Sequence, residues 1–161
     1  MNVLRWIVIV LAALVLLVWL GGRLGALRGQ APADLGVREG RLKPPSGTPN
    51  SVSSQADLYA DHPMREYARI AALPASGGAQ TSIARVRAVV ERLSGATVVE
   101  QRDDYLYAQF ETPAMRFIDD VEFWYDPAAQ TIAVRSASRI GRKDFGVNRA
   151  RIEAIRAQLL H

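Results

Sequence analysis

The acidic residues that could bind or transform a ligand cluster in one short segment. Asp119, Asp120 and Glu122 lie within residues 117–126, where the apolar alternation is typical of a β-strand. Adjacent strand residues point to opposite faces, so a regular strand cannot turn all three carboxylates toward one cation. Only a bulge at Asp119-Asp120 could bring them together, and no metal site is predicted.

The basic residues that could bind an anion follow on the next predicted strand, residues 131–139. A turn at residues 126–130 joins the two strands. If it pairs the residues that flank it, Glu122 lies opposite Arg135 and Phe123 lies opposite Val134. One interpretation of Glu122–Arg135 is an exposed cross-strand ion pair, worth under about 1 kcal/mol. The other is that Arg135 serves an anion site.

The same register predicts a polar patch on the face toward the core. There Asp119 would lie opposite Ser138, with Ser136 close by, and Arg139 would follow on the outer face. Asp119 and Ser138, together with Asn148, are the residues from which a hydrolase-like enzyme would have to be built.

The start of the last predicted helix, at about residue 145, is the second candidate for anion binding. A helix N-terminus offers free N–H groups and a partial positive charge, and arginines follow it. The alternative is purely structural, with Asp144 as the N-cap and Arg149 paired with Glu153. The predicted ligand-binding residues are Arg135, Ser138, Arg139, Asn148, Arg149, Asn50, Ser53 and Ser54.

No motif indicates an enzyme. The two histidines are His62, in a predicted loop, and His161, the last residue, and the chain has no cysteine. Nucleophile-elbow, phosphate-loop, dinucleotide-binding and metal-ligand spacings are all missing. No cofactor is therefore predicted, and a binding role is favoured over catalysis.

The elements that must position these residues can be read from periodicity. An amphipathic helix is expected from Thr81 or Ser82 to Gly95, and strands over residues 97–102, 105–112, 117–126 and 131–139. The predicted fold class is α+β, a four-stranded antiparallel sheet with one face covered by two helices. Tyr105, Tyr107 and Trp124 are expected to form a cross-strand aromatic cluster.

An unbroken apolar run over residues 6–20 precedes this domain. With its flanks it reaches the length of a membrane span, and Arg5 and Arg23 border it. A cleaved signal peptide is the alternative, but no good cleavage site follows the run. The predicted organisation is an anchor over residues 1–24, a Gly/Pro-rich tether over 25–49 and an α+β domain over 50–161.

Charge separates the anchor region from the domain. Residues 1–49 carry six basic and two acidic side chains, whereas residues 50–161 carry 14 of each sign. The basic surplus lies beside the membrane, where it suits anionic lipid. The domain has no net charge, which argues against nucleic-acid binding. The short N-terminal tail favours placing the domain outside the cytoplasm, in the periplasm or its equivalent.

Four ordered motifs carry a resemblance to a known family. They are PNSVSSQA at 49–56, FIDDVEF at 117–123, RSASRIG at 135–141 and DFGVNRAR at 144–151. With them the chain resembles the bacterial and plastid family catalogued as domain of unknown function 1499, over about residues 44–160. The resemblance implies no activity. It implies that residues 50–54 belong to the domain, beside the last hairpin, and that an N-terminal anchor or export signal is usual.

The best interpretation is a membrane-anchored, non-enzymatic envelope domain that binds an anionic group, such as a lipid head group, or a partner protein. One alternative is an accessory subunit of a membrane complex, for which a flat apolar surface near Trp124 would be the sign. The other alternative is the hydrolase-like enzyme on Asp119, Ser138 and Asn148.

Overall fold

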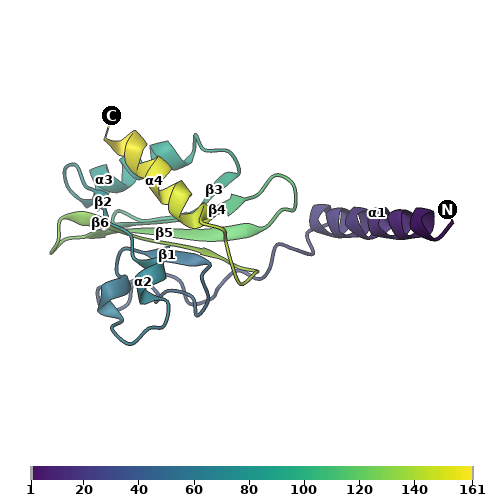
Figure 1. Cartoon of the computed structure of the whole chain (residues 1–161). Coiled ribbons are helices and arrows are strands. Elements are labelled where there is room, and N and C mark those ends of the chain that lie inside the picture. Colours follow the sequence, from purple (N-terminus) through teal and green to yellow (C-terminus); the bar gives the residue numbers. More distant parts are fainter. Residues whose placement is uncertain (1, 161) are drawn as a thin grey trace.

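The computed structural model describes residues 2–160. Met1 and His161, the end residues of the predicted anchor and domain, lie outside the described residues. Helix α1 (Asn2–Arg23) projects from an α+β domain that contains the rest of the chain (Figure 1). At about 1.5 Å per residue, its 22 residues extend roughly 33 Å, enough to cross a hydrocarbon core of about 30 Å.

The centre of the domain is an antiparallel meander of four strands. These are β3 (Ala96–Gln101), β4 (Tyr105–Glu111), β5 (Ile118–Asp126) and β6 (Thr131–Ser138). Each boundary lies within one residue of the prediction, because apolar alternation and the intervening turns define these strands locally.

Two further strands extend the sheet, which has six strands and not the predicted four. β1 (Ser51–Ser53) and β2 (Leu73–Pro74) both pair antiparallel with the edge of β6 that faces away from β5. They are too short to show an alternation of their own, so only pairing with β6 defines them. β1 confirms the expectation that residues 50–54 pack beside the last hairpin.

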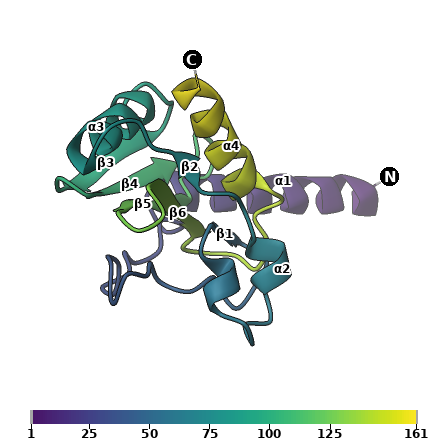
Figure 2. The same ribbon diagram turned by 90° about the vertical axis from the view of Figure 1, so that its left-hand side faces the viewer.

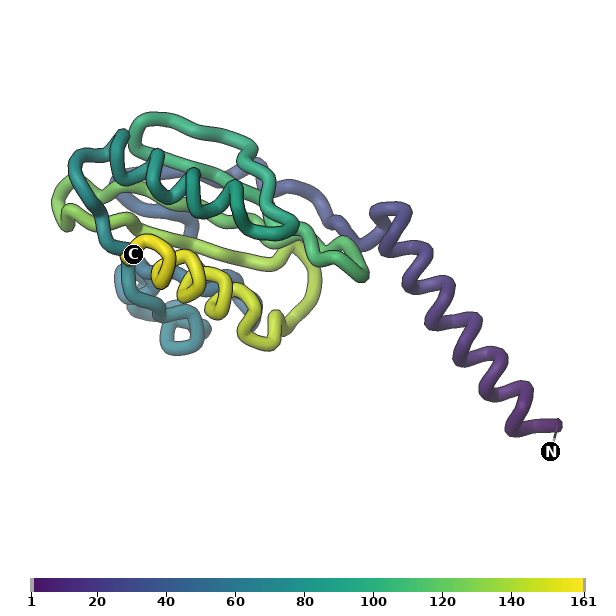
Figure 3. Tube along the Cα trace, turned by 90° about the horizontal axis from the view of Figure 1, so that it is seen from above, coloured from purple at the N-terminus to yellow at the C-terminus, as the bar shows by residue number. Residues whose placement is uncertain are grey.

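One face of the sheet is covered by α3 (Ala79–Val90) and α4 (Val147–Leu159), as predicted (Figure 2). Seen from above, the two helices lie side by side over the strands (Figure 3). Val86, Ile152 and Ile155 meet Phe123 and Val134 in a core from which water is excluded. α3 begins at Ala79, before the predicted Thr81 or Ser82, with Gly78 as its N-cap.

The opposite face of the sheet is also covered, which the sequence did not predict. The 3-10 helix η1 (Ala56–Leu58), the short helix α2 (Arg65–Ala68) and residues 34–45 lie on this side (Figure 2). Leu42 is 1% exposed and packs with Tyr105, Tyr107 and Trp124. Residues 34–45 therefore belong to the folded domain, although they were predicted as part of a tether.

Helix α1 ends against the loop between β4 and β5. A Cβ at Gly22 would lie 2.8 Å from the Met115 carbonyl oxygen, so glycine permits this close approach. Arg116 donates to the Arg23 carbonyl at 3.0 Å, and Arg28 forms an ion pair with Glu111 at 3.1 Å. These contacts hold the domain at the C-terminal end of α1.

Candidate functional site

The covered outer face of the sheet carries two buried groups of the same composition. In each, a carboxylate on β5 lies between a tyrosine on β4 and an arginine, which is on β6 in one group and directly follows β6 in the other. Pairing of Asp126 with Thr131 sets the register, and it places Glu122 opposite Arg135 as predicted. The two groups are Tyr105–Glu122–Arg135 and Tyr107–Asp120–Arg139.

In the Tyr107–Asp120–Arg139 group, both carboxylate oxygens accept hydrogen bonds from the protein itself. The Arg139 guanidinium donates to both Asp120 oxygens, at 2.7 and 2.8 Å, and to the Tyr107 hydroxyl at 3.2 Å. Tyr107 also donates to Asp120. The hydrogen bond to Asp120 raises the pKa of Arg139 above its ordinary value, although burial opposes this. The protein itself therefore supplies acceptors for Nε and Nη2 of Arg139.

The Tyr105–Glu122–Arg135 group is incomplete. Glu122 Oε1 accepts from the Gly36 N–H at 2.7 Å and from the Tyr105 hydroxyl at 2.9 Å, but Oε2 accepts no hydrogen bond from residues 2–160. Arg135 Nη1 lies 3.7 Å from that oxygen, too far for a hydrogen bond. Within the described residues, Arg135 donates only through Nε, to the Pro44 carbonyl at 3.1 Å.

Burial shifts both charges of this pair in the direction of neutrality. It raises the pKa of the Glu122 carboxyl, and the Gly36 N–H and Arg135 only partly offset this. It lowers the pKa of the Arg135 guanidinium, against the opposing influence of Glu122. A buried ion pair without a hydrogen bond between its charged groups recovers little of the free energy lost when both groups are desolvated.

A cavity of about 290 Å³ lies on this side of the domain, beside Pro44 and Tyr59. We call it the strap cavity. It is lined by Asp34, Gly36, Arg38, Glu39, Arg41, Leu42, Lys43, Pro44 and Tyr59. Arg135 is not a lining residue, but it donates to the carbonyl of one of them, Pro44. Lys43 pairs with Asp34 at 2.6 Å, whereas Arg38 and Arg41 form no ion pair within the described chain.

The polar patch on the core face exists as predicted, and Asn148 joins it. The Ser136 hydroxyl donates to Asn148 Oδ1, and Asn148 Nδ2 lies 3.1 Å from the Ser138 hydroxyl oxygen. The same amide reaches the Asn50 carbonyl at 3.1 Å and Asp144 at 2.9 Å. Asn148 is completely buried, so this network ties α4 to β6 and to the segment before β1.

Asp119, on the same face, is paired with an arginine that was not among the predicted site residues. Arg151 donates to Asp119, and it also reaches Asn148 Oδ1 at 2.8 Å. Its guanidinium lies over the Phe110 ring at 4.7 Å. The i,i+3 spacing from Asn148 to Arg151, which places both on one helical face, is the sequence signal that could have identified it.

This patch does not have the arrangement of a hydrolase. The hydroxyl of Ser138 accepts a hydrogen bond from the Asn148 amide, which is not a base, and Asp119 is neutralised by Arg151. His62 lies in the loop before α2, where its Nδ1 accepts from the Met64 N–H. Among residues 2–160, no group of three or more His, Cys, Asp or Glu side chains could hold a metal ion.

The N-terminus of α4 is occupied by the protein's own carboxylate. Asp144 accepts from the N–H groups of Gly146 and Asn148, both at 3.1 Å, and from the Tyr67 hydroxyl at 2.7 Å. Burial alone would raise the pKa of Asp144, but these hydrogen bonds hold it below its ordinary value. The helix begins at Val147, and Gly146 occupies the N-cap position. Asp144, two residues before Gly146, supplies the side chain that caps the helix.

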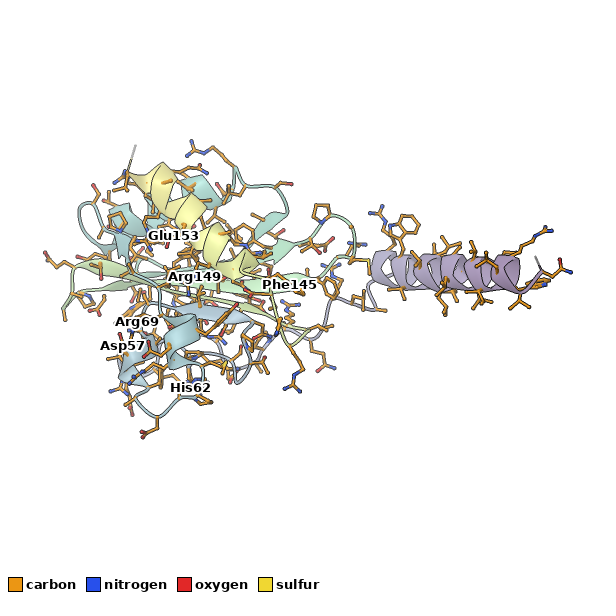
Figure 4. All side chains as sticks on the ribbon, in the orientation of Figure 1. Asp57, His62, Arg69, Phe145, Arg149 and Glu153 are labelled. Atoms are coloured by element: carbon orange, nitrogen blue, oxygen red, sulfur yellow. The ribbon has the colours of Figure 1, made fainter. Side chains whose placement is uncertain are left out.

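The structure does not bring the predicted ligand-binding residues to one anion-sized site. Arg135 and Arg139 lie on the outer face of the sheet, whereas Asn148 lies on the core face. Arg149 turns away from both and donates to the carbonyls of Tyr67 and Arg69, at 2.6 and 2.8 Å (Figure 4). The expected convergence is wrong because α4 and the outer face are separated by the sheet. Whether any of these residues binds a ligand stays a prediction.

The upstream residues of the predicted site are engaged in local structure. Ser53 Oγ accepts from the Gln55 N–H, and Ser54 Oγ accepts from the Val134 N–H at 2.9 Å. Asn50 Nδ2 donates to the Gly141 carbonyl at 2.7 Å. Trp124 is 8% exposed beneath residues 34–45, so the flat apolar surface expected of an accessory subunit is not found there.

Comparison with known proteins identifies a family for this chain. Residues 41–159 match the family model described as protein of unknown function DUF1499. No curated protein and no solved structure matches the chain. The matched range includes residues 41–45, which lie over the outer face of the sheet. The protein belongs to the DUF1499 family.

Proposed function

We propose that this protein is a single-pass membrane-anchored, non-enzymatic domain that binds a small anion in the strap cavity, on the outside of the cytoplasmic membrane. The observation that carries the proposal is Arg135. Its side chain is 4% exposed, yet its terminal N–H groups donate to no acceptor in residues 2–160.

A buried guanidinium with free donors is unfavourable unless an acceptor approaches it. Unpaired charges in a protein interior carry a desolvation penalty of several kcal/mol, and hydrogen bonds to charged groups recover about 1.5–3 kcal/mol each. Glu122 is a poor partner because its nearest oxygen is 3.7 Å away and burial raises its pKa. Arg135 does not itself line the cavity, but it donates to the carbonyl of the lining residue Pro44. A phosphate or carboxylate bound beside Pro44 would supply the missing acceptors.

The walls of the strap cavity suit a small anion. Its volume of about 290 Å³ is at the lower end of small-molecule pockets, which run from roughly 300 to 1,000 Å³. Three cations at the rim, Arg38, Arg41 and Lys43, outnumber the two carboxylates of Asp34 and Glu39. Of the three, only Lys43 forms an ion pair within residues 2–160. Such a rim raises the local concentration of anions.

Membrane attachment follows from α1. It is a helix long and apolar enough to cross a membrane, and its apolar 18-residue stretch is not buried in the domain. Exposed leucines, valines and isoleucines along 22 residues are unfavourable in water and favourable in lipid. We expect α1 to remain attached, since no good cleavage site follows it.

The proposal is tested by titrating the full chain, held in a nanodisc, with inorganic phosphate and with acetate in a calorimeter. We expect saturable binding at low ionic strength that weakens as salt screens the rim. Arg41→Ala should weaken binding, whereas Arg92→Ala, which removes an exposed arginine from the turn after α3, should not. Lack of saturable binding of either anion at low salt would overturn the anion site.

A further inference from the structure

The loop between β6 and α4, residues 139–146, exposes a large aromatic side chain. Phe145 is 92% exposed, and its backbone adopts a left-handed conformation with φ of 53°. Positive φ is uncommon for a bulky residue and is unfavourable unless surrounding contacts hold it. The bonds of Asp144 to Tyr67 and to the helix N-terminus hold the chain in this form.

The loop lies beside the end of α1. A Cβ at Gly29, six residues after the helix ends, would lie 3.0 Å from Cγ1 of Ile140 and 2.9 Å from Cβ of Arg139. The segment that leaves α1 therefore passes against the start of the β6–α4 loop. Figure 3 shows the start of α4 on the side of the domain toward which α1 extends, and Figure 4 shows Phe145 at this side.

The chemistry of the loop is that of a membrane interface. Ile140 is 38% and Val147 47% exposed, so they flank Phe145 with further apolar surface. Arg142 and Lys143 lie between them in the sequence, exposed and without an ion pair in the described chain. Aromatic side chains favour the head-group level of a bilayer, and basic side chains near it attract anionic lipids.

We propose that the β6–α4 loop is a second membrane contact, in which Phe145 inserts into the bilayer that α1 enters while Arg142 and Lys143 contact lipid phosphates. This inference rests on the anchoring part of the proposed function and is independent of the strap cavity. A lipid surface explains two features of the loop at once. It would contact both the exposed apolar side chains and the basic side chains, which lie next to the segment that leaves α1. Two attachments would fix the orientation of the domain on the membrane.

The experiment uses the absence of cysteine from the chain. Phe145→Cys is labelled with an environment-sensitive fluorophore and the full chain is reconstituted into vesicles of phosphatidylcholine with phosphatidylglycerol. We expect blue-shifted emission and quenching by lipids that carry a nitroxide near the head group. The matched control is Ala128→Cys, in the exposed turn between β5 and β6, which should show neither effect.

Removing the two basic side chains tests the lipid chemistry. In the labelled chain, Arg142→Ala with Lys143→Ala should reduce quenching in vesicles with phosphatidylglycerol, because the electrostatic attraction is lost. The loop contact would be overturned, and the anchor left intact, if the chain resists carbonate extraction but quenching at position 145 is no stronger than at position 128. Release of the chain by carbonate would overturn the anchor and this inference together, while phosphate binding is measured separately.

Discussion

Glu122 and Arg135 lie opposite each other on β5 and β6, both buried, with 3.7 Å between Oε2 and Nη1. Their pairing follows from the turn that joins the strands. Their burial follows from residues 34–45, which cover this face of the sheet. The interpretation of the pair as an exposed ion pair is therefore wrong, and the removal of either partner should have larger effects than a surface pair would show.

Replacing Glu122 by Gln should change how stability depends on pH. Burial raises the pKa of Glu122 above its ordinary value of 4.5, so the native protein holds this proton more tightly than the unfolded chain. The contribution of Glu122 to the free energy of unfolding is then most favourable below that value and falls as the pH rises through the folded pKa.

Glu122→Gln removes this contribution, so the free energy of unfolding should fall less steeply above about pH 4.5 than in the wild type. Denaturant unfolding at a series of pH values measures the difference. Glu153→Gln, at an exposed position on α4, is the control and should leave the slope unchanged. Parallel curves for Glu122→Gln and the wild type would contradict the prediction.

Leu42→Ala should destabilise the domain although Leu42 lies in a segment with the composition of a tether. Leu42 is 1% exposed, its N–H donates to Gln55 at 2.8 Å, and it packs with Trp124. Truncation of a buried leucine costs about 2–5 kcal/mol. Leu160→Ala, at a 67% exposed position, should change stability little. Equal stability of the two variants would show that residues 34–45 do not cover the sheet in solution.

Gly95→Ala should be among the most damaging single substitutions. Gly95 has φ of 77°, and a Cβ there would lie 2.3 Å from the Glu111 carbonyl oxygen, which is a backbone atom. The backbone must shift to accept it, which would disturb the pairing of β3 with β4. Gly47→Ala is the matched control, because open space surrounds that position and its φ is not positive. Thermal unfolding should separate the two variants clearly.

Asn148→Ala should destabilise the protein by about 2–6 kcal/mol, since two buried polar partners would be left unsatisfied at about 1–3 kcal/mol each. Ser136 and the Asn50 carbonyl would both lose a partner. Gln158→Ala, on an exposed part of the same helix, controls for helix propensity. A loss no larger than that of the control would mean that water replaces the amide.

A reporter enzyme that is active only outside the cytoplasm, fused to the C-terminus, should give activity in the membrane pellet. The expected orientation has the N-terminus of α1 inside the cytoplasm and the domain outside it. Activity in the soluble fraction would show cleavage after α1. An inactive reporter in the pellet would show the opposite orientation.

The sequence by itself determined the local parts of this protein. The apolar run of α1, the four strands of the meander and the register that opposes Glu122 to Arg135 all follow from periodicity and turns over a few residues. The position of Asn148 at the start of the last helix was likewise readable, and its family motifs were recognisable.

Only the tertiary structure decided what surrounds those residues. The burial of Glu122 depends on Gly36, 86 positions earlier, and the capping of α4 depends on Tyr67, 77 positions before Asp144. Segments rich in Gly and Pro, such as residues 34–45, have no regular spacing of apolar residues from which a buried face could be predicted. The position of such a segment is set by the surface that it covers. The sheet face that carries Tyr105 and Trp124 would be unfavourable in water, so covering it with an apolar segment stabilises the domain.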